Sequence, residues 1–137
     1  MAYERDTVQL VFFLRRRKNM SVEEFYQYWK DTHGPLVVRY ASVLGIRRYA
    51  QIRTLSQFSQ ALAERNGLVV EQFDGVAEIS YDARVFYAPR TFEQVEAADA
   101  LLRDERNFIE LSHSPLQAGK EYLLWDEGQP VQPSTTT

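Results

Sequence analysis

The 137-residue chain is 45% hydrophobic and 26% charged, which is the size and composition of one globular domain with its own core. It has no cysteine and two histidines, which excludes a disulfide framework, a thiol nucleophile, a cysteine-ligated metal and a histidine-rich metal centre within one chain. The net charge of −3 argues against nucleic acid as a partner. No apolar run approaches the roughly 20 residues that span a membrane, and residues 1–7 lack a signal-peptide core, so we expect a cytoplasmic protein.

The first predicted elements are a strand and a long helix. Apolar residues alternate over residues 8–14 and fall on both faces, which is typical of a strand buried on both sides. Ser21 and Glu24 form a capping box that begins a helix. Its apolar stripe consists of Val22, Phe25, Tyr26, Trp29, His33, Leu36, Val37 and Tyr40. Because proline disfavours helical geometry in the preceding residue, we expect a break near His33 and a second helix from Pro35 to about residue 43.

The middle of the chain alternates between strands and a short helix. Period-two patterns predict strands at residues 47–55 and 76–81. Between them, apolar residues at helical spacing predict a helical insertion at about residues 56–67. A second capping box, Thr91 with Gln94, begins a helix that ends near residue 104.

The C-terminal segment is predicted to hold the last strand, at residues 120–125. Residues 127–137 are rich in Gly, Pro, Ser and Thr and have the composition of a disordered tail. We therefore expect a single domain over residues 1–126.

The order of these elements predicts an α+β, ferredoxin-like split βαβ fold, with a four-stranded antiparallel sheet and its helices on one face. Helices on one face leave the other face open, yet several strands carry apolar residues on both sides. An open apolar face predicts a homodimer in which two sheets face each other. The aromatic residues divide accordingly: Phe12, Phe25 and Phe92 are expected in the core, and Phe13, Leu123 and Trp125 on the face that a partner covers.

His33 is the strongest candidate for chemistry. A histidine titrates near neutral pH and suits proton transfer, and this one lies where a helix is expected to break beside aromatic residues. The alternative is a histidine that caps the helix C-terminus, where positive charge is favoured. His113, between two serines, is either a partner of His33 or a solvated loop residue.

Two carboxylates and five aromatic residues are weaker candidates. Glu78 lies inside an apolar strand and is either at a solvated sheet edge, paired with an arginine such as Arg53, or in a pocket with a raised pKa. Asp74 precedes Gly75 and has a turn role as its alternative. The aromatic candidates either belong to the core, which is the commoner case, or line a pocket that binds a planar ligand; they are Tyr26, Tyr28, Trp29, Tyr40 and Tyr49. The sequence has no glycine-rich phosphate loop and no Gly-x-Ser-x-Gly motif, so we expect neither a nucleotide cofactor nor an acyl-enzyme.

The ordered residues Phe25, Trp29, His33 and Pro35, entered from a strand that ends in the basic run 15–17, resemble the EthD-type domain of the dimeric α/β-barrel superfamily. The resemblance covers about residues 8–126 and includes Phe73-Asp74-Gly75. It implies the same protomer, a face-to-face dimer, a cavity between sheet and helices, and His33 as the acid/base residue. Proteins of this fold include isomerases, dehydratases, decarboxylases and cofactor-free oxygenases, so the resemblance implies no single reaction.

We therefore expect a small cofactor-independent enzyme that transfers protons on a lactone, an enol or an aromatic polyketide-like compound, of isomerase, dehydratase or decarboxylase type. The predicted catalytic residues are His33 and His113. The predicted substrate-binding residues are Trp29, Tyr49, Tyr28, Glu78 and Asp74. The alternatives are a non-catalytic binding or accessory protein and a cofactor-free oxygenase. Convergence of His33, Glu78 and His113 on one cavity would favour an enzyme, and their dispersal would favour the binding protein.

Overall fold

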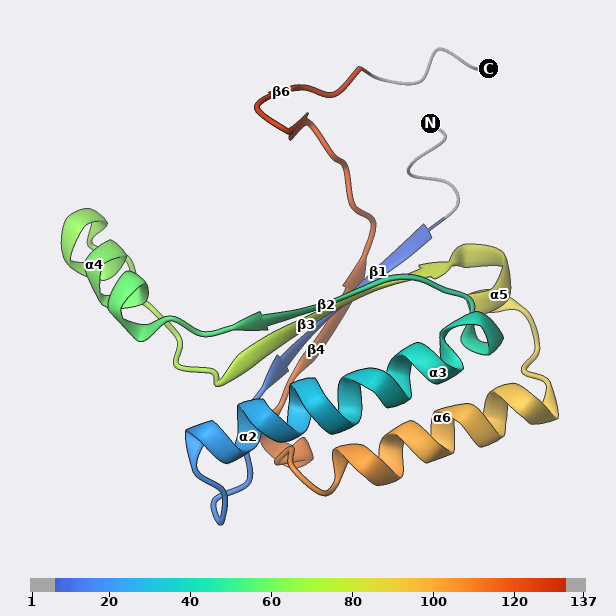
Figure 1. The fold of residues 1–137 in the computed structure, drawn as a ribbon. Coiled ribbons are helices and arrows are strands. Elements are labelled where there is room, and N and C mark those ends of the chain that lie inside the picture. Colours follow the sequence, from blue (N-terminus) through green and yellow to red (C-terminus); the bar gives the residue numbers. More distant parts are fainter. Residues whose placement is uncertain (1–6, 133–137) are drawn as a thin grey trace.

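A four-stranded antiparallel sheet carries its main helices on one face (Figure 1). The structure, a computed structural model, describes residues 7–132; the ends of the expected domain and tail at residues 1–6 and 133–137 lie outside the described residues. The strand order is β2-β3-β1-β4. The strands are β1 (Thr7–Leu14), β2 (Ile46–Arg53), β3 (Gly75–Asp82) and β4 (Leu116–Gly119). This arrangement confirms the predicted ferredoxin-like α+β fold.

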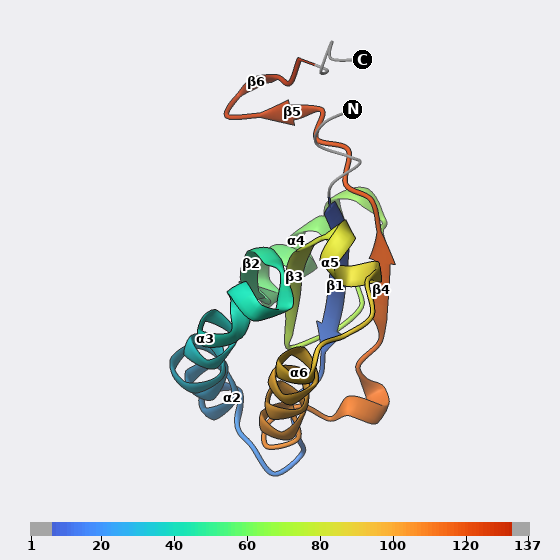
Figure 2. The ribbon, with the colours of Figure 1, turned by 90° about the vertical axis from the view of Figure 1, so that its right-hand side faces the viewer.

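The prediction for the last strand is wrong in position. β4 precedes the expected segment at residues 120–125, because its backbone pairs with β1 from Phe12 opposite Leu116 to Gln9 opposite Gly119. Gln9 is only two residues from the described start of β1, so β4 has little of β1 left to pair with and the chain leaves the sheet there. Two residues, β5 (Trp125–Asp126), then pair with β6 (Gln129–Pro130) in a hairpin apart from the main sheet (Figure 2).

The two main helical segments begin at the predicted capping boxes. Ser21 and Glu24 exchange side-chain and backbone hydrogen bonds before α2 (Val22–Tyr28), and Thr91 and Gln94 do the same before α6 (Phe92–Glu105). Each box satisfies amide groups that have no partner inside the helix.

The helical break expected at His33 does not occur. A π-helical turn, η1 (Trp29–His33), joins α2 to α3 (Gly34–Leu44) without interruption. Phe25, Trp29, His33 and Val37 are all buried at spacings of four. In a straight α-helix each such step rotates the side chain by about 40° away from the core. The wider π turn offsets this drift and accommodates Pro35, so the helix continues with His33 on its buried face.

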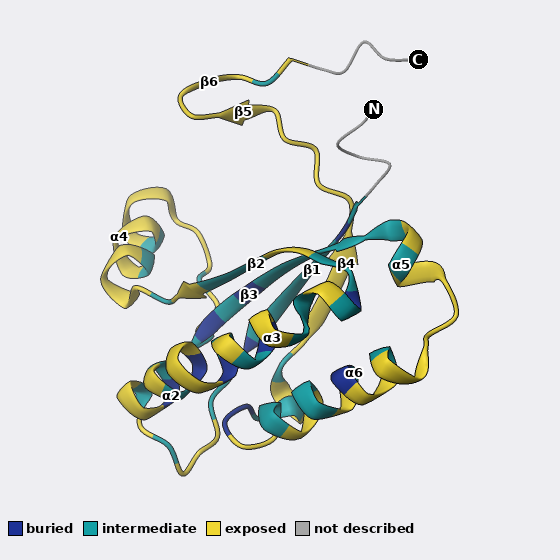
Figure 3. Cartoon of the chain, turned by 45° about the vertical axis from the view of Figure 1, so that its right-hand side comes forward, coloured by how far each residue is buried: buried dark blue, intermediate teal, exposed yellow. Residues whose placement is uncertain are grey.

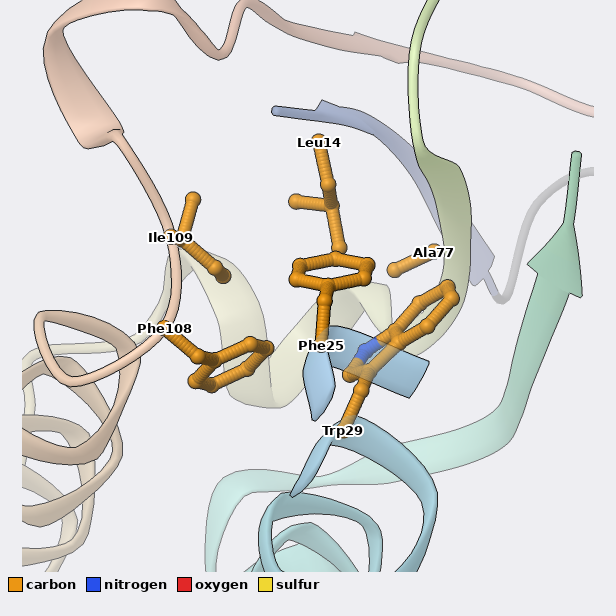
Figure 4. Close-up of a cluster of buried hydrophobic side chains, with 6 residues drawn as sticks. All are labelled: Leu14, Phe25, Trp29, Ala77, Phe108 and Ile109. Atoms are coloured by element: carbon orange, nitrogen blue, oxygen red, sulfur yellow. The ribbon is translucent and has the colours of Figure 1, made fainter. Parts of the chain in front are cut away.

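The core lies between the sheet and the helical layer. Figure 4 shows its six central side chains: Leu14, Phe25, Trp29, Ala77, Phe108 and Ile109. Phe92, which was expected in this core, is 77% exposed. It precedes the buried Ala97 of α6 by five residues, which places its side chain about 140° around the helix from the buried face.

Three shorter elements complete the fold. The predicted insertion forms α4 (Ser56–Asn66), which has no buried residue and stands outside the main body (Figure 3). A short helix that was not predicted, α5 (Ala83–Tyr87), follows β3, and a 3-10 turn, η2 (Leu111–His113), precedes β4. Over residues 7–132, none of the helices combines the length and the apolar character needed to cross a membrane.

Two glycines that end helices provide a matched test of packing. Gly45 follows α3 with φ of 71°, and a Cβ there would lie 2.7 Å from Val85 side-chain atoms; Gly67 follows α4 with φ of 65° and has no atom within 4 Å of such a Cβ. We expect Gly67→Ala to lower the free energy of unfolding by about 1 kcal/mol through backbone strain alone. Gly45→Ala adds the clash and should cost about 2–4 kcal/mol. Urea denaturation measures both, and equal losses would contradict the proposed contact with Val85.

Candidate active site

The π turn directs His33 into the interior between the two helical segments and the sheet. Its residue is 4% exposed, and its ring packs on Phe108 with ring centroids 5.0 Å apart. Nδ1 lies 2.7 Å from Oδ2 of Asp104, near the end of α6. This contact joins the junction of α2 and α3 to the neighbouring helix.

Asp104 is itself held in place from two directions. The Tyr28 hydroxyl donates to Oδ1 at 2.5 Å, and the Asn107 amide lies 3.2 Å from that hydroxyl and 3.4 Å from the same Oδ1. Because an ionised carboxylate only accepts hydrogen bonds, it fixes the His33 proton on Nδ1. The lone pair on Nε2 is then free for chemistry.

Glu105 lies on the free side of the imidazole, with Oε2 3.9 Å from Nε2 of His33. Burial, together with the neighbouring charge of Asp104, raises the pKa of Glu105 to about 7. Burial lowers the pKa of His33 below its ordinary value, although the hydrogen bond and the charge of Asp104 act in the opposite direction. Near neutral pH the site therefore holds a neutral histidine beside a carboxyl group that is about half protonated.

An interior cavity of about 60 Å³ borders both groups. Its lining includes Tyr49 and Tyr81 and is otherwise mostly apolar, with Trp29 on one wall. A neighbouring cavity of about 190 Å³ shares Tyr81 and Glu105 with it and extends toward α5 and the start of α6. The two cavities together form a small, aromatic-lined space between the sheet and the helices.

Gln51 connects the sheet to the π turn beside this space. Its Nε2 donates to the Trp29 carbonyl and to the Tyr49 hydroxyl, both at 2.9 Å. Burial raises the pKa values of Tyr49 and Tyr81, so both phenols stay protonated at neutral pH. Each can therefore donate a hydrogen bond to a carbonyl oxygen in the cavity.

The structure brings together three of the seven predicted site residues: His33, Trp29 and Tyr49 line the inner cavity. Tyr28 does not line it and instead supports Asp104. His113 lies in the exposed η2 turn, with Nδ1 2.9 Å from the Ser112 hydroxyl.

The two carboxylates predicted to bind substrate also lie elsewhere. Glu78 is on the open face of the sheet, 3.5 Å from Arg48 rather than paired with Arg53. Asp74 joins segments that are distant in sequence and does not make the local turn contact that was its alternative. Its carboxylate accepts the Arg16 backbone N–H at 2.8 Å, and its carbonyl accepts from the Tyr26 hydroxyl. His33, Glu78 and His113 therefore do not converge.

Two residues of the site, Asp104 and Glu105, were not predicted. They lie more than 70 positions from His33, so no local spacing relates them to it. The one available signal was a pair of adjacent carboxylates at the end of a predicted helix, where a negative charge opposes the helix dipole. Over residues 7–132, no three His, Asp or Glu side chains are grouped as metal ligands.

The fold is that of a ferredoxin-like α+β protein, and His33, Asp104 and Glu105 lie together between its sheet and its helices. The sequence model of the EthD domain matches residues 17–112, and the chain belongs to this family. None of the curated proteins matches the chain significantly.

Solved structures share the fold at low sequence identity. An EthD-like protein from Ralstonia eutropha is 17% identical, with a TM-score of 0.51 over 83% of this chain and 90% of that one. A dimeric ferredoxin-like protein of unknown function from Thermobifida fusca is 10% identical, with a TM-score of 0.53 over 88% and 97%. A hydroxynitrile lyase from Passiflora edulis is 14% identical, with a TM-score of 0.51 over 85% and 94%. These likenesses concern the fold alone.

The raised pKa of Glu105 predicts a pH-dependent stability. Between its ordinary value of 4.5 and its value of about 7 here, the folded state binds more protons than the unfolded state, so stability falls as pH rises through this window. We expect Glu105→Gln to remove this fall and to gain up to about 3 kcal/mol over the wild type above pH 7, with no such gain below pH 4.5. Urea denaturation across this range measures it. Glu96→Gln, at an exposed position of the same helix, is the matched control, and a parallel gain there would contradict the assignment.

Proposed function

We propose that the protein is a small cofactor-independent enzyme that transfers protons on a carbonyl or enol compound of lactone or aromatic polyketide-like type. The arrangement of three residues carries this proposal: Asp104 orients His33, and the free nitrogen of His33 lies 3.9 Å from the carboxyl group of Glu105. A neutral imidazole as base, beside a carboxyl group whose pKa is raised to about 7, suits general acid/base catalysis.

The reaction follows from the two groups. Nε2 of His33 removes a proton from the carbon next to a carbonyl, and the C–H electron pair forms the enol double bond. Glu105 gives its proton to the carbonyl oxygen at the same time. In an isomerisation, His33 returns its proton to a different carbon and the enol proton returns to Glu105. In a dehydration, Glu105 gives its proton to the leaving hydroxyl instead of to the carbonyl oxygen. In a decarboxylation, the carbanion that remains when CO₂ leaves takes the proton of Glu105.

The shape of the site limits the substrate. The inner cavity of about 60 Å³ holds only the reacting end of a molecule, and the neighbouring cavity of about 190 Å³ holds the rest. The mostly aromatic and aliphatic lining of the inner cavity suits a flat ring, and the neighbouring cavity adds the polar side chains of Arg90 and Gln94. The Passiflora edulis structure shows that a lyase exists on this fold, which supports an enzyme at the level of fold analogy.

A non-catalytic binding or accessory protein is the second candidate. The observation in its favour is the dispersal of His33, Glu78 and His113. Glu105 takes the place that the two dispersed residues were expected to fill, which is why we favour the enzyme.

Turnover of lactones, β-keto acids and aromatic phenols by His33→Ala and Asp104→Asn tests the proposal. We expect His33→Ala to lower kcat by about 10²–10⁴-fold, since the base is lost. Asp104 raises the pKa of His33, so Asp104→Asn should move the acidic limb of the pH profile to lower pH and reduce kcat.

Glu96→Gln is the control for these activities and should keep wild-type turnover. A cofactor-free oxygenase would differ from the proposed enzyme, because its turnover would stop in the absence of oxygen. Full turnover by His33→Ala would remove His33 from the chemistry. A bound small molecule that co-purifies with the wild type, with no turnover of any compound, would favour the binding protein.

We also propose that a second copy covers the open face of the sheet. Phe13, Val76 and Ile52 form an apolar row across β1, β3 and β2 on the side away from the helices. Ile52 is 44% exposed in the single chain. The dimeric Thermobifida fusca protein has the same fold and supports this assembly.

Light scattering after size exclusion tests the dimer. We expect the wild type to have the mass of two chains and Ile52→Glu to weaken association at least tenfold, because a charge would be buried in the interface. Arg103→Glu changes a charge on the exposed side of α6 and is the control. A wild type with the mass of one chain would contradict the proposal.

A further inference from the structure

The segment after β4 is an apolar arm whose side chains are left exposed by the described residues 7–119. Residues 120–131, here called the C-terminal arm, run away from the helical layer beyond the end of β4 (Figures 1 and 2). Four consecutive side chains, Tyr122, Leu123, Leu124 and Trp125, are 58%, 40%, 73% and 64% exposed. The arm nevertheless has a defined conformation, because Val131 donates to the Leu124 carbonyl and β5 pairs with β6. Four adjacent exposed apolar side chains mark an interaction surface.

The second unpartnered apolar surface lies on and beside α4. Leu55, Phe58 and Leu62 recur at helical spacing and are 55%, 69% and 50% exposed. Leu68 and Val69, in the segment after the helix, are 58% and 95% exposed. Because α4 has no buried residue, this stripe makes little contact with its own domain.

The two surfaces lie at opposite ends of the sheet. α4 connects the end of β2 to the start of β3, where Arg53 faces Gly75. The arm begins at the other end, after Gly119, which faces Gln9. When two sheets face each other about a two-fold axis that runs across the strands, each end of one sheet meets the opposite end of the other. Such an axis brings the arm of each copy to α4 of its partner.

One charge contact is available between the two surfaces. The turn of the arm carries Asp126 and Glu127, and the last turn of α4 carries Arg65, beside Glu64 of opposite charge. Asp126, Glu127 and Arg65 are exposed, and none of these three makes an ion pair within the described part of the chain.

We propose that the C-terminal arm of one copy packs against α4 of a second copy, in a reciprocal exchange between the two. This inference rests on the proposed dimer, and it assigns a function to the helical insertion and to the arm that the interior site does not use. The alternative position of the arm is on its own chain, where Val8, Tyr87 and Lys120 border an open cavity near residue 120, at which the arm begins.

The absence of natural cysteines makes the test direct. The full chain is prepared with Phe58→Cys, with Trp125→Cys and with both substitutions, and is treated with a short bismaleimide. We expect the double variant to give covalent two-chain product at least fivefold above either single variant. Arg103→Cys, on the exposed side of α6, is the background control.

Each other outcome overturns the exchange. A strong two-chain product from Trp125→Cys alone would show that the arms meet each other, and the same from Phe58→Cys alone would show that the α4 helices meet. A cross-linked single chain from the double variant would show that the arm folds back on its own domain. If the double variant gives no cross-link while the wild type has a two-chain mass, the position of the arm is overturned and the dimer is retained. A wild type of one-chain mass would overturn both.

Discussion

The hydrogen bond between His33 and Asp104 determines how the rest of the interior is arranged. It joins two helical segments that are far apart in sequence, and it does so inside the protein, where a buried polar group without a partner would be costly. The same contact orients the imidazole, because the carboxylate fixes the proton on Nδ1. One pair of side chains thus both ties the π turn to the end of α6 and sets the direction of the free nitrogen.

The π turn and the aromatic core are consequences of this constraint. His33 reaches Asp104 because the wider turn keeps it on the face that carries Phe25 and Trp29. Trp29 in turn lies against the backbone of β3, where a Cβ on Gly75 would come within 2.6 Å of its ring. A glycine at the start of β3 is therefore required for the indole to reach the sheet and to form a wall of the cavity.

The fold could be predicted from the sequence where the signal was local. Strand alternation at residues 8–14 and the capping boxes at Ser21 and Thr91 depend on neighbours within a few positions, and the structure confirms them. β4 could not be placed in this way, since its position is set by pairing with β1, and the apolar alternation at residues 120–125 lies outside the four-stranded sheet.

The site was predictable to a similar degree. His33, Trp29 and Tyr49 stand out by residue type and by position on a buried stripe, and they do line the cavity. Asp104 and Glu105 become functional candidates only when α6 packs beside α3, which is a tertiary contact. The π turn could not be predicted because the local signal was misleading. Gly34 and Pro35 indicated a break in the helix, but the burial of side chains spaced four residues apart keeps the helix continuous.

One face of the sheet forms a wall of the cavity and the other face is open for the proposed dimer, and β3 contributes side chains to both. Ala77, Ile79 and Tyr81 point from β3 into the cavity, whereas Val76 and Glu78 alternate with them on the open face. A partner that packs on the open face holds the backbone of the strand that forms the cavity wall. Closely packed interiors transmit such restraint over short distances. The proposed reaction requires Nε2 of His33 and the Glu105 carboxyl to keep their separation of 3.9 Å. The proposed dimer would help to maintain it, because a partner on the open face would hold β3 in place.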